Sequence, residues 1–183
     1  MKIGIVIGSI RQGRKAGEVG SWVHRLASER GGAEFVLLDV ASYDLPLLTA
    51  QTVPAMAKRQ YDDERVTRWS AAIDACDGYV FVTPEYNHSV PGAFKNAVDL
   101  LGPEWTGKTV GFVSYGADGG VRAVEHWRQI IANFSMIDVR QQVSMSAFEE
   151  FPKGEFTPNR RRPVELATLL QQLIAATARL HPT

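Results

Sequence analysis

The sequence predicts an α/β protein in which a parallel sheet lies between helices on both faces. Short apolar runs alternate along the chain with longer segments whose apolar residues recur at helical spacing. The apolar runs are continuous, as in strands buried on both faces of a sheet. Strands that alternate with helices pair in parallel through right-handed crossovers. The 183 residues fit one domain, and we expect residues 1–183 to form it.

Five segments have the composition of strands. The first is a continuous β-branched run, and the third stops at a proline, which cannot continue a ladder of hydrogen bonds. The fifth segment has the weakest apolar pattern. In chain order, we expect strands at residues 2–7, 34–38, 78–83, 108–114 and 137–143.

The segments between and after these runs have helical periodicity. Pro91 stands where a helix can begin, because proline is tolerated in a first turn. Trp22, Trp69 and Trp127 fall on apolar helix faces, so we expect them in the core or at subunit contacts. Trp105 has no such position, and we expect it to border a site or an interface. The predicted helices cover residues 17–29, 61–76, 91–101, 121–134 and 163–180.

Composition excludes several classes of protein. Twenty basic residues balance twenty acidic ones, which gives no support for a general binder of nucleic acid or of anionic membranes. No apolar stretch approaches the length of a membrane helix, and the N-terminal run is too short for a signal peptide. Cys76 is the one cysteine, so no internal disulfide forms, and we expect a cytoplasmic protein.

Metal chemistry is not expected. The histidines are scattered without the spacing of a metal site, and Cys76 has apolar neighbours typical of a buried side chain. The sequence therefore predicts no metal ligands. The four histidines are His24, His88, His126 and His181.

The first candidate loop, residues 8–17, follows a predicted strand and precedes a helix. Ligands of parallel sheets bind at the carboxyl ends of the strands, and a helix N-terminus there attracts anions. Ser9 offers a hydroxyl, and Arg11 and Arg14 offer guanidinium groups suited to phosphate. The spacing of the glycines matches neither the dinucleotide fingerprint nor the P-loop. The alternative is a helix-capping turn with solvated arginines, and for Lys15 a solvated side chain.

The second loop, residues 83–92, is stiffened by two prolines. Asn87 can present a donor and an acceptor to a heterocycle, and Tyr86 can pack against a ring. The alternative is an ordinary turn in which Tyr86 covers the core. His88 and Glu85 are tempting as an acid or base, but no spacing indicates a catalytic triad, and we expect neither to be catalytic.

The third loop, residues 114–120, is rich in glycine and again separates a strand from a helix. Glycine permits positive φ and a close approach of the backbone to a ligand. Backbone amides of this loop can therefore bond the polar edge of a ring. The alternative is a glycine-rich hairpin, which the helical pattern that follows argues against.

Together the three loops resemble those of the NADPH-dependent FMN reductase family, which includes quinone, azo-dye and chromate reductases. The matching pieces are G-S-I-R after the first strand, T-P-E-Y-N with P-G-A-F-K-N-A-V-D after the third, and S-Y-G-A-D-G-G after the fourth. The likeness extends from residue 1 to about residue 143 in the same order, and its middle motif is the most specific.

The resemblance implies a flavodoxin-like α/β/α sandwich with sheet order 2-1-3-4-5 and a bound FMN. On this view the first loop holds the phosphate, the second lies along the isoalloxazine, and the third flanks its other edge. Family members are usually homodimers or homotetramers. The cofactor-binding residues that the resemblance implies are Ser9, Arg11, Arg14, Lys15, Ala16, Gly17, Pro84, Glu85, Tyr86, Asn87, Ser114, Tyr115, Gly116, Gly119 and Gly120.

The first loop departs from the family pattern at two positions. Many members carry Ser and Asn where this chain has Arg14 and Ala16. Two hydrogen-bonding side chains are lost and one positive charge is gained. We hypothesise that Arg14 compensates by binding the phosphate directly.

The function that the resemblance implies is reduction of a small acceptor, such as a quinone, flavin or azo compound, by NADH or NADPH through FMN. The cofactor performs the chemistry, so no catalytic side chain is expected. Nicotinamide and acceptor would use the same face in turn, which predicts ping-pong kinetics. Two alternatives are a flavodoxin-type electron carrier, disfavoured by the neutral charge and basic loop, and a regulatory protein without flavin.

The sequence leaves several properties open. It does not identify the physiological acceptor, the preference between NADH and NADPH, or whether FMN is a bound cofactor or a substrate. Residues 144–163 match no pattern, and either a surface loop or an interface arm would suit them.

Overall fold

The computed structural model describes residues 1–180. His181, one of the four histidines of the sequence, lies outside this range. Its five strands form one parallel sheet in the order β2-β1-β3-β4-β5, which confirms the expected topology. The strand order reverses direction between β1 and β3, and such switch points are where open parallel sheets bind ligands. The strands are β1 (Lys2–Ile7), β2 (Glu34–Asp39), β3 (Gly78–Pro84), β4 (Thr109–Gly116) and β5 (Ile137–Ser146).

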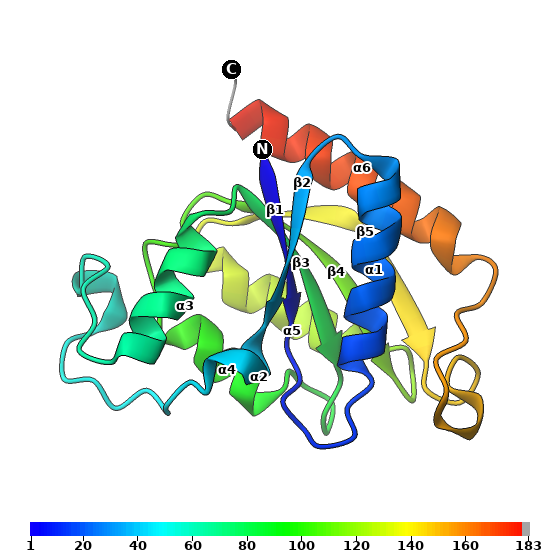
Figure 1. Ribbon diagram of the computed structural model, residues 1–183, viewed down its shortest axis with the longest axis horizontal. Helices are drawn as coiled ribbons and strands as arrows, with labels where there is room; N and C mark the ends of the chain where they lie inside the picture. The colour runs from blue at the N-terminus through cyan, green and yellow to red at the C-terminus, as the bar shows by residue number, and fades with distance from the viewer. Residues whose placement is uncertain (181–183) are drawn as a thin grey trace.

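Helices cover both faces of the sheet and complete the α/β/α sandwich (Figure 1). The first and last helices pack on one face, and α3, α4 and α5 pack on the other. Two short 3-10 helices lie at Pro54–Met56 and Pro152–Gly154. The helices are α1 (Ala16–Arg30), α2 (Val40–Tyr43), α3 (Glu64–Asp74), α4 (Gly92–Asp99), α5 (Val121–Ala132) and α6 (Arg162–Leu180).

The observed elements differ from the predicted ones mainly at their ends. Helix α3 begins three residues later than expected because Asp63 is extended and its carboxylate caps the helix, accepting from the Arg65 amide at 2.8 Å. Helix α2 was not predicted, since four residues carry no periodicity. Strand β5 has ten residues, three more than its weak pattern indicated, with a register irregularity opposite β4.

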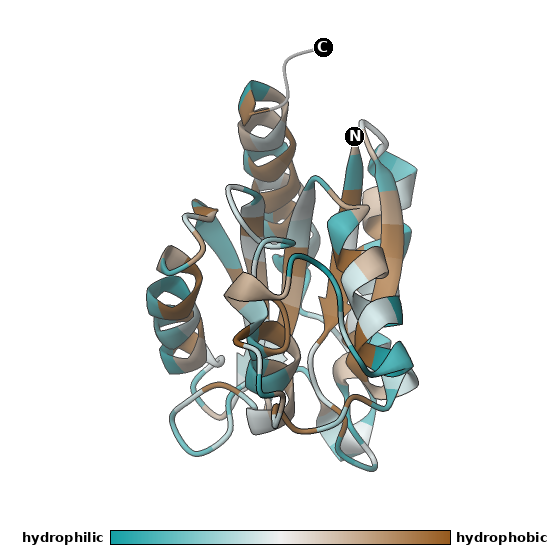
Figure 2. Cartoon of the chain, turned by 90° about the vertical axis from the view of Figure 1, so that its left-hand side faces the viewer, coloured by the Kyte–Doolittle hydropathy of each residue, from teal (hydrophilic) through white to brown (hydrophobic). Residues whose placement is uncertain are grey.

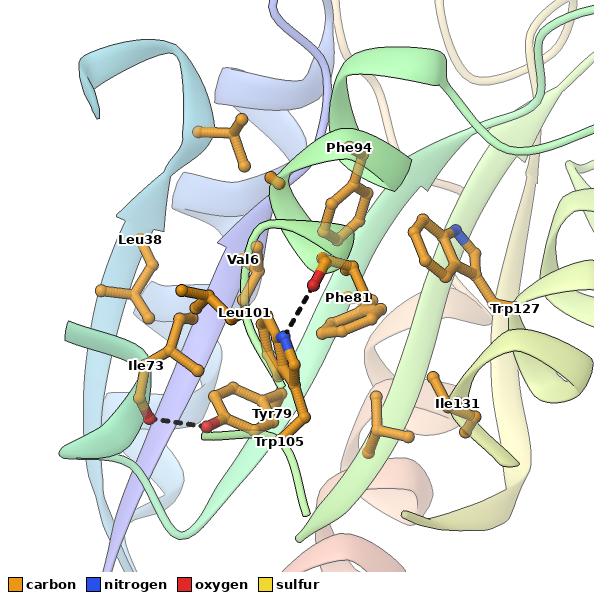
Figure 3. Packing of buried hydrophobic residues seen from close by; sticks show 14 of the residues in the cluster. Val6, Leu38, Ile73, Tyr79, Phe81, Phe94, Leu101, Trp105, Trp127 and Ile131 are labelled. Carbon is orange, nitrogen blue, oxygen red and sulfur yellow. Dashed lines mark hydrogen bonds between the residues drawn. The ribbon is translucent and has the colours of Figure 1, made fainter. Parts of the chain in front are cut away.

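The core consists of two apolar clusters, one on each face of the sheet. The strands are the most apolar part of the chain, with polar residues on the outer helix surfaces (Figure 2). On the α3–α5 face, Phe81 of β3 lies at the centre of a group of aromatic rings (Figure 3). Its ring centroid is 4.8–6.2 Å from those of Phe94, Trp127, Trp105, Phe112 and Tyr79.

The tryptophans belong to this core. Trp69 and Trp127 are fully buried and Trp22 nearly so, as expected. The expectation for Trp105 was wrong. Its side chain is fully buried within the chain and its indole N–H donates to the Val98 carbonyl at 3.1 Å (Figure 3), so it borders neither the surface nor the site. The loop after α4 folds inward at this point, which periodicity does not reveal.

Cys76 is a buried thiol, and burial raises its pKa to about 11. Because the thiolate is the reactive species, we expect native protein at about pH 8 to react with an aromatic disulfide reagent far more slowly than denatured protein. Absorbance of the released thiolate measures both rates. Equal rates in the two states would contradict this environment for Cys76.

Candidate functional site

The carboxyl ends of β1, β3 and β4 bring the three candidate loops together. Backbone hydrogen bonds connect the neighbouring strand ends. The Gly8 amide donates to the Val82 carbonyl at 3.0 Å, and the Glu85 amide donates to the Tyr115 carbonyl at 3.0 Å. The site therefore lies where the strand order reverses, at the lower end of the sheet in Figure 1.

The first loop presents an open helix N-terminus. Lys15 is the N-cap residue of α1, and its side chain forms no capping bond. A Cβ on Gly17, in the first turn, would meet no atom within 4 Å, so this backbone is open to a ligand. The side chain of Arg11, four residues before the N-cap, is exposed. Uncapped N–H groups and a nearby guanidinium are the components of an anion site.

Ser9 and Tyr86 join the first loop to the second. Ser9 is fully buried, and its hydroxyl lies 2.7 Å from the Tyr86 hydroxyl. The sequence offered two positions for Tyr86, along a ring or over the core. The structure directs the Tyr86 hydroxyl at the first loop, where the two hydroxyls bond each other and one O–H remains free to donate to an anion.

Two basic residues of the first loop have partners within the protein. The Arg14 guanidinium is bound by the Asp39 carboxylate, so the structure does not leave it free at the anion site. The Lys15 ammonium donates to the Gly154 carbonyl and pairs with Glu18 at 3.4 Å. The sequence did not indicate the contacts with Asp39 and Gly154, because both residues are remote in the chain from the first loop.

The tip of the second loop is a two-residue turn. Tyr86 and Ser89 exchange backbone hydrogen bonds of 3.0 and 3.1 Å. Asn87 and His88 between them have φ values of 50° and 67°, the combination of a type I′ turn. Both side chains are exposed. Pro84, at the base of the loop, is the last residue of β3 and is buried.

Helix α5 anchors the second loop at two positions one helical turn apart. The Glu85 carboxylate accepts from the Arg122 amide at 3.1 Å and from its Nε at 2.6 Å. The Ser89 hydroxyl lies 2.8 Å from Nδ1 of His126. Because residues four apart share a helix face, one side of α5 fixes the loop. The Glu85 side chain is 6% exposed, which identifies it as a structural anchor.

A third anchor lies beneath the loop. The Trp127 indole donates to the Thr83 hydroxyl at 3.1 Å within the aromatic core. The second loop is thus rigid at its base, its middle and its end, and only the turn between the anchors projects into solvent.

The third loop depends on glycine conformation. Gly119 and Gly120 have φ values of 73° and 74°, in the region that L-residues rarely adopt. The Ser114 hydroxyl donates to the Gly119 carbonyl at 2.7 Å and is buried, so it holds the loop rather than facing a ligand. A Cβ on Gly116 would lie 3.2 Å from the Glu85 Cβ, which shows how closely the second and third loops approach.

Residues 147–161, here called the arm, border the site. The Ala147 amide donates to the Gly116 carbonyl at 2.8 Å. The Phe151 ring lies 5.6 Å from that of Tyr115, whose pKa is raised by burial. Further along, the Phe156 amide donates to the Glu18 carboxylate of α1 at 3.1 Å. The arm therefore packs on the outer side of the first and third loops, a position that no sequence pattern indicated.

The arm is held by a buried ion pair. Glu150 is 1% exposed and accepts from Arg162 at 2.6 Å and from the Asn159 amide at 3.2 Å.

In residues 1–180, no group of three or more His, Cys, Asp or Glu side chains is placed to hold a metal ion. Within the same range no helix is long and apolar enough to cross a membrane.

An α/β/α sandwich with a candidate anion site and a glycine loop at its switch point defines a flavodoxin-like protein. The family model described as NADPH-dependent FMN reductase matches residues 1–150, and the chain belongs to this family. Both the fold and the family expected from the sequence are confirmed.

Relatives support the assignment. An NAD(P)H-dependent FMN reductase from a Nectria species is 43% identical over 126 residues, which cover 67% of this chain and 63% of the relative. The match thus spans less than two thirds of that protein. A quinone reductase of Escherichia coli is 34% identical over 139 residues, with 72% and 69% covered.

A solved structure shares the fold over 97% of the chain. It is a flavoenzyme NAD(P)H:(acceptor) oxidoreductase from Paracoccus denitrificans, with a TM-score of 0.75 and 97% of each chain covered. At 21% identity this likeness concerns the fold alone.

Proposed function

We propose that the protein binds FMN in the three loops and uses NADH or NADPH to reduce small acceptors such as quinones, flavins or azo compounds. The observation that carries this proposal is the open N-terminus of α1, which follows Ser9 and Arg11 in the same loop and lies on the same sheet edge as the glycine loop. Family membership and relatives named as FMN and quinone reductases support it. When bound, FMN supplies the redox chemistry.

The residues present suit FMN. Amides of Ala16 and Gly17, the hydroxyls of Ser9 and Tyr86 and the Arg11 guanidinium would hold the phosphate. Backbone groups of the second loop and the exposed Asn87 amide would face one edge of the ring system. Amides of the third loop, kept open by Gly119 and Gly120, would face another.

In this proposal Pro84, Glu85, Ser114 and Tyr115 shape the site without contributing catalytic groups. Their side chains are buried or bonded within the protein, so they act by positioning the loops. No side chain is assigned as an acid or base. We expect ping-pong kinetics, seen as parallel lines in double-reciprocal plots, and converging lines would contradict alternate use of one face.

The visible absorption spectrum tests the function first. Protein is measured as purified and again after addition of FMN and gel filtration. Retained bands at ~375 and ~450 nm that bleach with NADPH or NADH would support a flavin enzyme. If the protein retains no FMN, a turnover assay with free FMN distinguishes FMN as substrate from the absence of a flavin role.

Arg11→Ala is expected to weaken FMN binding about tenfold and to leave riboflavin binding nearly unchanged, because only FMN carries the phosphate. Titration of flavin fluorescence measures both affinities. Arg30→Ala is a matched control, since Arg30 is an exposed arginine in the last turn of α1, at the end of the helix that does not face the first loop. Equal losses for FMN and riboflavin would argue against a phosphate contact at Arg11.

We further propose a homodimer or homotetramer of single-domain subunits in the cytoplasm. Exposed apolar side chains of the loop before α3 support association: Leu47 is 75% exposed, Val53 62% and Met56 72%. A single free cysteine suits a reducing compartment. Sedimentation equilibrium tests the oligomeric state, and a monomer at micromolar concentration would contradict it.

A further inference from the structure

The Arg14 guanidinium joins the first loop to the end of β2. Its Nη1 and Nη2 donate to the two carboxylate oxygens of Asp39 at 2.6 and 2.5 Å, and Nη1 also donates to the Ser9 carbonyl at 2.5 Å. The side chains are 22% and 29% exposed. A bidentate pair of this kind fixes both direction and distance, unlike a single contact between charges.

Asp39 is itself held in place. It is the last residue of β2 and the N-cap of α2, where its carboxylate accepts from the Ala41 amide at 3.1 Å. Its carbonyl accepts from the Ser42 hydroxyl at 2.7 Å. The partner of Arg14 is therefore part of the sheet and a helix start, and through Arg14 it fixes the backbone at Ser9.

We propose that Arg14 and Asp39 are positioning residues that hold the first loop in its anion-binding shape before FMN arrives. Neither is assigned a contact with the phosphate. This revises the direct role considered for Arg14, and it rests on the proposed binding of FMN. A preformed loop binds more tightly because less conformational entropy is lost on binding.

Electrostatics and positioning predict opposite effects at Asp39. As a negative charge near an anion site, Asp39 repels phosphate, so its removal would tighten FMN binding if charge alone acted. If Arg14 were a phosphate ligand, removal of Asp39 would also release it for that role. If Asp39 instead positions the loop, its removal weakens binding. The sign of the change therefore separates the mechanisms.

The experiment measures FMN and riboflavin affinities of Asp39→Asn, Arg14→Ala and the double variant by fluorescence titration. We expect each single change to weaken FMN binding about tenfold and the double change to add little, since both remove one interaction. Riboflavin affinity should stay constant. Asp44→Asn is the matched control, because this substitution removes the same charge at the other end of α2, where the Asp44 side chain is 90% exposed.

Hydrogen exchange of the cofactor-free protein provides a second readout. Amides of residues 9–15 should exchange faster in Asp39→Asn than in the unaltered protein and in Asp44→Asn. Unchanged exchange, or tighter FMN binding by Asp39→Asn together with a loss in Arg14→Ala, would overturn the inference. Failure of the unaltered protein to bind FMN would overturn the proposed function, while the exchange result would still decide whether the pair holds the loop.

Discussion

Phe81→Ala is expected to lower the free energy of unfolding by about 3–5 kcal/mol, the range for loss of a large buried aromatic side chain. Phe81 is fully buried, and five aromatic rings surround it on the α3–α5 face of the sheet. Truncation leaves a cavity that these rings cannot fill without abandoning their packing with one another. Urea denaturation followed by circular dichroism measures the change.

Phe148→Ala is the control for this effect, since Phe148 is 79% exposed in the arm. The same truncation there should change the free energy of unfolding by less than about 0.5 kcal/mol. Similar losses in both variants would show that the aromatic group around Phe81 does not dominate the core of that face.

Gly120→Ala is expected to destabilise the protein by about 2–4 kcal/mol and to disrupt the third loop. Gly120 has φ 74°, and an added Cβ would lie 3.0 Å from the Ser114 Cβ and from both the amide nitrogen and carbonyl oxygen of Tyr115. Backbone atoms cannot rotate away as a flexible side chain can. The loop must shift, and we expect weaker binding of FMN and riboflavin alike.

Gly13→Ala separates the effect of backbone strain at positive φ from the effect of steric contacts made by the added Cβ. Gly13 has φ 67°, but an added Cβ would meet no atom within 4 Å. Only the backbone strain of about 1 kcal/mol applies there. Thermal unfolding of both variants, with riboflavin titration, checks the prediction. Equal destabilisation would mean that the contacts around Gly120 relax freely.

Local patterns predicted the sheet and most helices because strands buried on both faces leave continuous apolar runs, and covering helices leave periodic ones. The carboxyl-edge rule then located the three loops. Helix α2 and the burial of Trp105 were not predicted. A four-residue helix is too short to show hydrophobic periodicity, and a loop that packs into the core has no regular spacing of apolar residues.

Partners distant in the chain could not be predicted. Arg14 and Asp39 are 25 residues apart, and Glu85 and Arg122 are 37 apart. Each pair meets because the sheet places consecutive loops side by side, and a charged residue in one loop carries no local sign of its partner. The sequence therefore indicated three candidate binding loops, while the side chains that are bonded within the protein could be identified only from the structure.

The turn at Asn87 and His88 has an evolutionary consequence. The residues on either side of the turn, Tyr86 and Ser89, are held by backbone hydrogen bonds to each other. Helix α5 contacts the loop at Glu85 and Ser89, outside the turn itself. Side chains at the tip can therefore be exchanged with little cost to folding, within the set that tolerates positive φ. Asn87 faces the ring system in the proposed function, so His88 is the tip position at which the sequence can diverge while the loop and the flavin contacts are kept.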